Sequence, residues 1–390
     1  MIRTHLEPPG ASGAPSSSRP HRAARLEDVV NRRIAHWLWA RGWRTRIVPY
    51  TGYGGSGWVR VMARTVLARP RDDERDLTGL EPEAGLEPET EGRPDERRPQ
   101  DERQLQDQRR RSVRGWRRLA TAQVKGAVVE VRAGDRVRHV MSDRGGYIDA
   151  VVEADLEPGW HDVELALPTG STTARVFVIG PDVTCGIVSD IDDTIMVTAA
   201  PRTLLAIWNT FVLRENARRP VPGMAQLYQR LLRDEPQAPV LYLSTGPWNA
   251  APTLGHFLRR HGFPAGAMLL TDWGPTNSGW FRGGAQHKRE NLRRLMLEFP
   301  NIRWLLIGDD GQRDPEIYAE LAAERPERVR GVAIRQLTAT QQTLAHGAPT
   351  PPPDARGSRK RTVEAGVPFV AGPDGARLDQ ALRDARVDLT

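Results

Sequence analysis

The chain has 390 residues and a formal net charge of +7, a length sufficient for two or three domains. A single cysteine, Cys185, excludes an intramolecular disulfide, and no apolar run approaches the ~18 residues of a membrane-spanning helix. The N-terminus lacks the apolar middle of a secretory signal, so we expect a cytoplasmic protein that is at most peripheral to a membrane.

The chain begins with a stretch rich in Pro, Ser, Gly and Arg, which predicts a disordered basic arm over 1–24. Residues 25–70 are expected to hold an amphipathic helix and then a strand that joins a β domain. The apolar residues of this helix recur every four positions: Leu26, Val30, Ile34 and Leu38. Such a helix could lie on an anionic membrane or pack on its own domain, and the sequence leaves both open.

Positive charge is concentrated in this part of the chain. Residues 1–70 carry twelve Arg against three acids. The excess favours an anionic partner, and we expect phospholipid head groups rather than nucleic acid. Arg-biased coding explains it equally well. The glycines of 52–57 formally match a dinucleotide loop, but the alternation that follows them indicates a strand, so no nucleotide cofactor is expected.

The middle of the chain has two parts that differ in composition. Residues 71–112 have almost no apolar content, which predicts a charged, disordered insertion. Residues 113–181 hold short β-like runs separated by Gly- and Asp-bearing turns, which predicts a small antiparallel β-sandwich-like accessory domain. This domain shows no catalytic cluster, so we expect it to serve positioning, localisation or scaffolding.

The last part begins with strands that alternate with helical patterns over 182–342. Apolar strands without polar alternation predict an α/β domain with a parallel Rossmann-like sheet covered on both faces. Residues 343–390 are rich in Pro, Gly and Arg and are interpreted as a mostly disordered tail, with a short helix near 376–386.

Polar side chains follow three of the predicted strands of 182–342. Their sequences are Asp190-Ile191-Asp192-Asp193-Thr194, Ser244-Thr245 and Asp309-Asp310, with Asp314 close behind the last. Lys288, one of only three lysines, opens the helix before the Asp309 strand. Because ligands bind at the C-terminal ends of parallel strands, we expect these groups to meet.

A divalent cation explains the crowded carboxylates. Mg²⁺ prefers oxygen ligands and keeps several waters, so Asp190 and Asp309, on neighbouring strand ends, suit it. The cation and Lys288 would offset carboxylate repulsion and attract a phosphate. Ser244 can donate a hydrogen bond to a phosphoryl oxygen. A carboxylate nucleophile can form an aspartyl phosphate, and a second carboxylate such as Asp192 can transfer the protons.

These motifs, taken in order, carry a resemblance. "DIDDT", Ser244, Lys288 and "GDDGQRD" resemble the haloacid-dehalogenase-like phosphohydrolase superfamily. "LYLSTGPWN", "HKRENL" and "LIGDDGQRDPEIYAEL" are similar, more narrowly, to the catalytic domain of the actin-patch-associated phosphatidate phosphatases and their bacterial relatives. The likeness spans 45–70 and 113–342, and it implies a haloacid-dehalogenase-type sheet with a small cap and Mg²⁺ dependence.

The resemblance also implies catalytic roles. Asp190 would be the nucleophile and a metal ligand. Asp192 would be the general acid and base, with its backbone carbonyl on the metal, and Asp309 would be a further metal ligand. Ser244 and Lys288 would bind the transferring phosphoryl group.

Five neighbours are expected to support the site or to stand beside it. Thr194 would cap a turn or hold the general acid, and Asp314 would orient the metal's water shell or the lysine. Thr245 competes with the preceding serine. Asp310 stands where the related motif often has Ser and would add a carboxylate near the metal. Asp193 is interpreted as an exposed turn residue.

An amphipathic stretch at 201–223 is a candidate lid whose apolar surface would suit a lipid, although packing on the core is an equal alternative. The leading hypothesis is an Mg²⁺-dependent phosphatase that converts phosphatidate to diacylglycerol or acts on a related lipid phosphate. The alternatives are a phosphatase for a nucleotide, nucleic-acid end or phosphoprotein, and a non-catalytic phospholipid-binding scaffold. The sequence predicts no oligomeric state.

Overall fold

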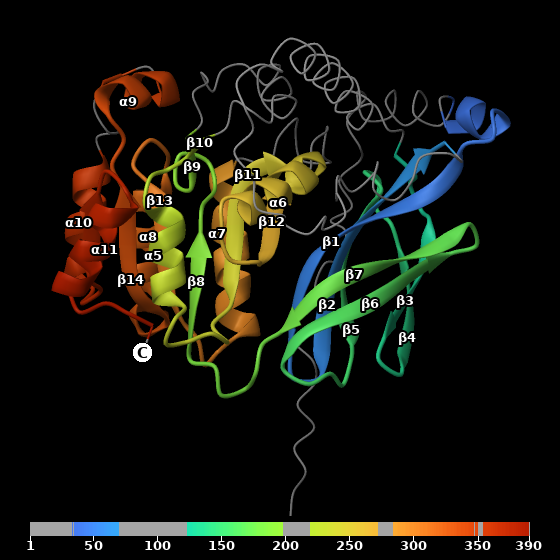
Figure 1. Ribbon diagram of the computed structural model, residues 1–390, viewed down its shortest axis with the longest axis horizontal. Coiled ribbons are helices and arrows are strands. Elements are labelled where there is room, and N and C mark those ends of the chain that lie inside the picture. Colours follow the sequence, from blue (N-terminus) through green and yellow to red (C-terminus); the bar gives the residue numbers. More distant parts are fainter. Residues whose placement is uncertain are drawn as a thin grey trace, which may run out of the picture.

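The computed structural model describes residues 33, 35–69, 123–197, 219–271, 284–346, 348–349 and 354–389. These residues form two main sheets that lie side by side (Figure 1). The predicted arm at 1–24, the charged insertion at 71–112 and most of the candidate lid lie outside the described residues.

The first sheet has seven strands in the order β4-β3-β6-β7-β1-β2-β5. They are β1 (Arg44–Gly55), β2 (Trp58–Ala68), β3 (Val128–Ala133), β4 (Arg136–Met141), β5 (Tyr147–Glu153), β6 (Gly159–Leu167) and β7 (Gly170–Val178). Neighbouring strands are antiparallel except for β1 and β7. Strands from both sides of 70–122 thus belong to one sheet.

This sheet curls around its own core, in place of the two layers of the predicted sandwich. Its two edge strands, β4 and β5, lie close enough for Arg138 on β4 to donate a 2.7 Å hydrogen bond to the carbonyl oxygen of Val151 on β5. Alternate side chains point inward and are buried, among them Val59, Val61, Val129, Val131, Val163, Leu165 and Val176. Buried and exposed side chains alternate along the strands in the same way in a curled sheet and in a sandwich, so the sequence pattern could not distinguish these two architectures.

The second sheet has six parallel strands in the order β12-β11-β8-β13-β14-β15. They are β8 (Cys185–Ser189), β11 (Val240–Pro247), β12 (Ala267–Thr271), β13 (Arg303–Asp309), β14 (Val329–Arg335) and β15 (Phe369–Gly372). The predicted α/β architecture with a parallel sheet is therefore confirmed.

Helices cover both faces of this sheet (Figure 1). One face carries α5 (Met224–Leu231), α6 (Ala251–Arg260) and α11 (Gly375–Asp384), and the other carries α7 (Gly284–Glu298), α8 (Asp314–Glu324) and α10 (Asp354–Glu364). The shorter elements are β9 (Met196–Val197), β10 (Arg219–Pro220), η2 (Trp248–Ala250), η3 (Pro326–Arg328) and α9 (Ala339–His346).

The interpretation of 343–390 as a mostly disordered tail is wrong for its described part. β15 pairs with β14 and extends the sheet, and α11 packs on α5. The sequence did not predict α10, because the helix lacks an apolar face. It packs against α8 with the small polar side chains of Ser358 and Thr362 buried, whereas Val363 is exposed. The short helix expected near 376–386 corresponds to α11.

The two sheets share a packed interface. Tyr50 on β1 stacks on Trp248, just beyond β11, with ring centroids 4.7 Å apart. At the end of α7, Glu298 accepts hydrogen bonds of 2.7 Å from Tyr53 and 2.6 Å from Arg60. The first sheet therefore contacts both α7, through Glu298, and the residues that follow β11, through Trp248.

The described part of the N-terminal helix covers one end of the first sheet. Residues 35–40 are helical, and Ala35 and Leu38 pack with Leu67 and Val124 in a small buried cluster. The inner face of this part thus packs on its own domain. Among the described residues, no helix has both the length and the apolar character needed to span a bilayer.

Candidate active site

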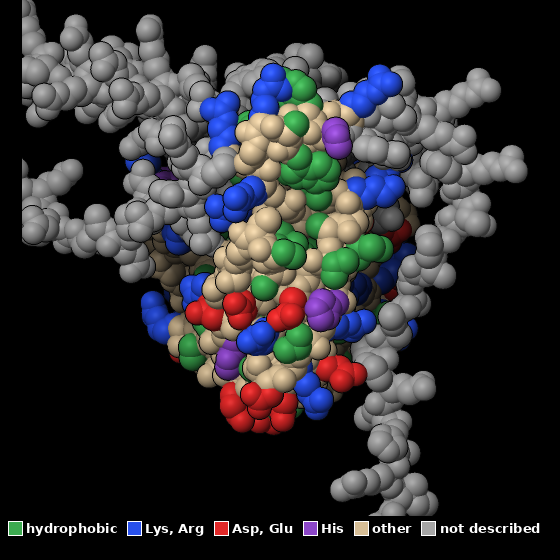
Figure 2. Space-filling view, turned by 90° about the vertical axis from the view of Figure 1, so that its right-hand side faces the viewer, with side chains coloured by type: hydrophobic (Ala, Val, Ile, Leu, Met, Phe, Trp, Pro, Cys, Tyr) green, Lys and Arg blue, Asp and Glu red, His purple; other side chains and the backbone are tan. Residues whose placement is uncertain are grey.

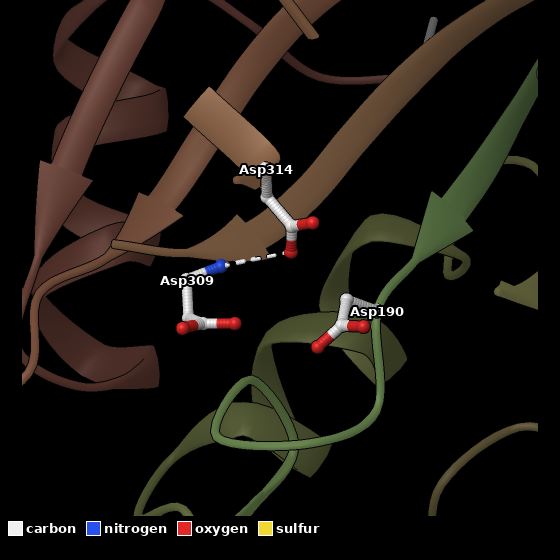
Figure 3. Close-up of side chains that lie close together, drawn as sticks. All are labelled: Asp190, Asp309 and Asp314. Carbon is white, nitrogen blue, oxygen red and sulfur yellow. Dashed lines mark hydrogen bonds between the residues drawn. The ribbon is translucent and has the colours of Figure 1, made fainter. Parts of the chain in front are cut away.

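The C-terminal edge of the parallel sheet gathers three buried carboxylates. Asp190 follows β8, Asp309 ends β13 and Asp314 begins α8. β8 and β13 are neighbours, so the first two meet at the edge. One oxygen from each residue lies within 4.8 Å of the others, and each residue is at most 1% exposed (Figure 3).

A glycine makes this approach possible. The chain turns from β13 into α8, and the backbone nitrogen of Asp309 donates a long, 3.4 Å hydrogen bond to Asp314 Oδ2. A Cβ on Gly308 would lie 2.6 Å from that same Oδ2 and 2.8 Å from Tyr318. The space beside the β13 end is therefore occupied by Asp314 only because residue 308 has no side chain.

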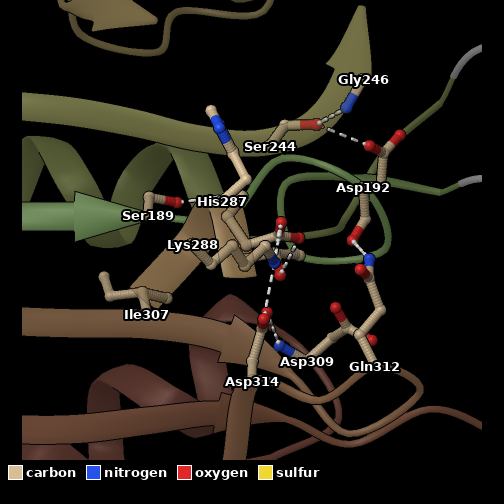
Figure 4. A network of polar contacts seen from close by, with 12 residues as sticks. Ser189, Asp192, Ser244, Gly246, His287, Lys288, Ile307, Asp309, Gln312 and Asp314 are labelled. Atoms are coloured by element: carbon tan, nitrogen blue, oxygen red, sulfur yellow. Dashed lines mark hydrogen bonds and ion pairs between the residues drawn. The ribbon is translucent and has the colours of Figure 1, made fainter. Parts of the chain in front are cut away.

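Lys288 on α7 is the buried cation of the cluster. Its Nζ donates to Asp190 Oδ1 at 2.6 Å and to Asp314 Oδ1 at 2.5 Å (Figure 4). Burial lowers the pKa of Lys288, but the two carboxylates outweigh this effect and the pKa is raised. Burial raises the pKa of Asp190 to about 8, against the opposing effect of Lys288.

The charge balance of the site favours a further cation. One ammonium group faces three buried carboxylates, and buried unbalanced charge is unfavourable. The converging donors are all carboxylate oxygens, without a thiolate or imidazole in the cluster formed by the described residues. Such a set fits a hard divalent ion like Mg²⁺.

Ser244 lies opposite this cluster, on β11. Its Oγ donates a 3.0 Å hydrogen bond to Asp192 Oδ2 and accepts a 2.9 Å bond from the backbone nitrogen of Gly246 (Figure 4). Thr245 turns toward the start of α7, where its methyl group would meet a Cβ on Gly284 at 2.6 Å. The structure therefore brings Ser244, and not Thr245, to Asp192.

Two of the expected supporting residues take other partners than expected. Thr194 Oγ1 donates to Asp190 Oδ2 at 3.1 Å, so it holds Asp190 rather than Asp192. Asp310 Oδ1 accepts from the backbone nitrogen of Leu337 at 2.8 Å and from Gln342 at 2.7 Å. Asp310 thus fastens the connection that follows β14 and is not among the three converging carboxylates.

Asp193 is buried, and the expectation of an exposed turn residue is wrong. Its φ of 56° places it in the left-handed region, where the chain reverses sharply after β8. Its carbonyl oxygen accepts a 2.6 Å hydrogen bond from Arg335 at the end of β14. The turn that displays Asp190 and Asp192 is therefore tied to the opposite half of the sheet.

Three residues that position the site were missed from the sequence. Arg335 is a buried strand-ending residue, and the rule that selected Asp309 would have found it. Ser189 Oγ donates to the Asp190 carbonyl oxygen at 2.7 Å and lies 2.5 Å from the Tyr228 hydroxyl. Nothing in the sequence marked Tyr228 as a site residue, because it occupies an ordinary buried position of α5.

The segment that carries the carboxylates, Lys288 and Ser244 matches a known family. Residues 185–336 match the model described as "Phosphatidate phosphatase APP1, catalytic domain". This segment belongs to that family. Residues 185–336, termed the APP1-type segment, end just after β14, so β15 and α11 lie beyond this segment.

Two fungal proteins are similar to this segment. An uncharacterized protein of Schizosaccharomyces pombe is 29% identical over 152 residues, which is 39% of this chain and 25% of that protein. Phosphatidate phosphatase APP1 of Saccharomyces cerevisiae is 25% identical over 151 residues, 38% of this chain and 25% of that protein. The match thus spans about a quarter of the length of each relative.

Solved structures give only distant likenesses. A carbohydrate acetylesterase from Xanthomonas citri is 14% identical, with 69% of this chain and 70% of that chain covered, at a TM-score of 0.27. A family 2 glycosyl hydrolase from Bacteroides cellulosilyticus is 10% identical, with 85% and 45% covered, at a TM-score of 0.19. Scores this low carry no conclusion about fold or chemistry.

Proposed function

We propose that the APP1-type segment hydrolyses a phosphate monoester with Mg²⁺, as a phosphatase of the haloacid-dehalogenase type, and that its substrate is phosphatidate or a related lipid phosphate. The observation that carries the chemistry is the meeting of Asp190, Asp309 and Asp314 around Lys288 at the C-terminal edge of the sheet. The lipid substrate is supported by the family match and by the printed name of the yeast relative.

The metal would be held by the carboxylates of Asp190 and Asp309 together with the backbone carbonyl of Asp192. When bound, Mg²⁺ would offset the negative charge of the phosphoryl oxygens and of the carboxylates. Asp314 already accepts from Lys288 and from the Asp309 backbone, so its role is to orient these two groups. Asp309 is thereby fixed at the strand end.

In the first step, an Asp190 carboxylate oxygen attacks phosphorus, and the bond between phosphorus and the ester oxygen breaks. Asp192 donates a proton to the departing oxygen, which leaves as the alcohol. Lys288 and Ser244 hold the phosphoryl oxygens during the transfer. Before substrate binds, the single hydroxyl hydrogen of Ser244 is donated to Asp192 at 3.0 Å, so it must turn to a phosphoryl oxygen on binding.

In the second step, water attacks the phosphorus of the aspartyl phosphate. Asp192, now ionised, takes the proton of that water, and the acyl–phosphate bond breaks to release inorganic phosphate and Asp190. The nucleophile must be ionised to begin again. Burial opposes this ionisation, whereas Lys288 favours it, as a bound cation would.

Phosphate release by the full chain tests the proposal. The substrates are phosphatidate in mixed micelles, a nucleotide and a phosphopeptide, each with Mg²⁺. Asp190→Asn should reduce release by roughly a thousandfold or more. The matched control is Asp182→Asn, an exposed aspartate just before β8, which should leave the rate unchanged.

The outcomes separate the two halves of the proposal. Faster turnover of the nucleotide or phosphopeptide than of phosphatidate would refute the lipid substrate but keep the phosphatase. Full activity of Asp190→Asn would refute the mechanism. The absence of release from all three substrates would leave the non-catalytic scaffold as the better hypothesis.

A further inference from the structure

We propose that one end of the seven-stranded sheet is a docking surface for an anionic phospholipid bilayer. This surface, termed the Trp–Arg end, comprises Trp37, Trp39, Arg41, Trp43, Arg44, Arg69 and Lys125. The proposal assigns a partner surface outside the APP1-type segment and does not depend on the phosphatase chemistry.

Packing brings the parts of the Trp–Arg end together. Arg44 at the start of β1 pairs with Ala68 at the end of β2. The backbone nitrogen of Val124 donates a 3.1 Å hydrogen bond to Thr65 on β2, which places Lys125 beside the same strand end. Helix 35–40 lies over this end through the buried cluster already described. Three separate stretches of chain thus present one surface.

The two flanks of helix 35–40 carry tryptophan where an ordinary surface helix would carry charge. Trp37 is 55% exposed and Trp39 is 45% exposed, one on either side of Leu38, which faces inward and is buried together with Ala35. Tryptophan is enriched at membrane–water interfaces, because its ring is largely apolar and its N–H is polar. Two exposed tryptophans on one short helix therefore suit insertion among lipid head groups.

The charge around these rings complements an anionic bilayer. The sequence contains no Asp or Glu between Asp28 and Asp72, and the cations of the Trp–Arg end are exposed. Figure 2 shows Lys and Arg side chains from the top to the bottom of this face, whereas Asp and Glu side chains gather mostly toward its lower end. Each cation near an anionic leaflet strengthens binding about fivefold.

The rings are arranged in a way that favours lipid over nucleic acid. The Arg41 guanidinium lies 3.3 Å from the centroid of the Trp37 ring, and that of Arg69 lies 5.3 Å from the Trp43 ring. These ring faces are therefore already paired with cations, whereas base stacking on single strands needs an open aromatic face. Cation-paired indoles remain suited to the head-group region, where the guanidinium can reach phosphate.

The Trp–Arg end and the candidate active site face the same side of the molecule. Helix 35–40 and the C-terminal ends of β8 and β13 all lie toward the upper side in Figure 1. The Tyr50–Trp248 stack and the Arg60–Glu298 pair hold the two sheets in this arrangement. If the proposed lipid phosphatase function holds, docking would bring the carboxylate cluster toward the membrane that contains the substrate.

Vesicle sedimentation of the full chain tests the docking proposal. The vesicles are phosphatidylcholine alone, or with about 30 mol% phosphatidylserine, which is a phosphodiester and offers no monoester to the active site. We expect binding only to the anionic vesicles, weakened as salt rises from about 0.1 to about 0.5 M. The double variant Trp37→Ser, Trp39→Ser should bind roughly tenfold more weakly.

Two matched double variants serve as controls. Leu297→Ser with Val363→Ser removes two large exposed hydrophobic side chains elsewhere and should leave binding unchanged. Arg41→Glu with Arg69→Glu should abolish binding, whereas Arg356→Glu with Arg377→Glu, the same change of net charge at exposed sites near the C-terminus, should largely preserve it. Turnover of a soluble aryl phosphate by the tryptophan variant should match that of the unaltered chain.

Unaltered vesicle binding by the tryptophan variant would overturn the proposal, as would equal binding to neutral vesicles. So would loss of binding to single-stranded DNA by the tryptophan variant with retained binding to vesicles, which would assign this surface to nucleic acid. A chain without phosphatase activity that still shows the predicted vesicle binding would refute the proposed function and leave the docking surface standing.

Discussion

Lys288 Nζ on α7 lies 2.6 Å from Asp190 Oδ1 beyond β8, and both side chains are almost completely buried. Removing one partner of a buried pair leaves an uncompensated charge. This pair is therefore the electrostatic centre of the site, and it joins the proposed nucleophile, Asp190, to Lys288, which is proposed to hold the substrate phosphate. The predictions that follow concern this pair, the metal that the carboxylates suit, and the packing that supports them.

Replacing the buried ammonium group should destabilise the protein. Lys288→Met leaves Asp314 without its counter-charge and Asp190 without its hydrogen-bond donor, which should cost about 3 kcal/mol and lower the midpoint of thermal unfolding by roughly 5–10 °C in chelator. Saturating Mg²⁺ should restore part of the loss. Lys125→Met, at an exposed lysine, is the control, and equal midpoints for the two variants would contradict this account.

Mg²⁺ should stabilise the folded protein, and more so at higher pH. Because burial raises the pKa of Asp190 from 3.8 to about 8, the metal-free protein loses stability as pH rises through this range. Below about pH 8 the metal must displace a proton, so its apparent affinity falls. Thermal unfolding with Mg²⁺ and with chelator, at about pH 6 and about pH 8.5, should show the larger difference at the higher pH.

The metal effect should depend on the carboxylates that converge. Asp309→Asn should remove most of the Mg²⁺-dependent rise in the unfolding midpoint, because a neutral amide is a weaker ligand for a hard cation. Asp310→Asn should keep it, since Asp310 instead accepts from Leu337 and Gln342. An equal loss in both variants would show that the metal lies elsewhere.

The close approach at Gly308 should be essential for the geometry of the site. Gly308→Ala would push Asp314 away from its position beside Asp309, and a displacement of this kind should reduce phosphate release roughly a hundredfold. Gly357→Ala, where an added Cβ meets nothing within 4 Å, is the control and should leave the rate unchanged. Equal rates for the two variants would show that this contact is not needed.

The stack between the sheets should support the catalytic segment. Tyr50→Ala removes the ring that covers Trp248, which should cost about 3 kcal/mol and lower the midpoint of thermal unfolding. Val137→Ala, at an exposed position on β4, should change the midpoint little. If the Tyr50 variant unfolds like the unaltered chain, the first sheet does not stabilise the second.

The sequence was most informative where one rule applied to several elements. In a parallel sheet the C-terminal ends of the strands share one edge, so the sequence alone predicted that Asp190, Ser244 and Asp309 meet. Lys288 was found from its place at the start of the helix before the Asp309 strand, and the scarcity of lysine in this chain supported it. The hydrogen-bond partners of Thr194 and Asp310 could not be predicted, since they depend on side-chain directions in two tight turns.

Other parts of the fold were hidden for physical reasons. β15 has only four residues, and α10 packs through Ser358 and Thr362, so neither shows the apolar periodicity that marks an element. Apolar periodicity did identify helix 35–40, but it emphasised the buried Leu38. The exposed Trp37 and Trp39 on the flanks of this helix became informative only once the inner face was known.

The most direct test of the central claim is to trap the covalent phosphate. In Asp192→Asn the second step lacks its base. An aryl phosphate, whose leaving group needs no proton, should still phosphorylate Asp190, and the aspartyl phosphate should accumulate. Hydride reduction followed by peptide mass spectrometry should find the modified residue at position 190, and none when Asp190→Asn is added. Sustained phosphate release without any covalent phosphate, or the same modification in the Asp190→Asn protein, would contradict the proposed mechanism.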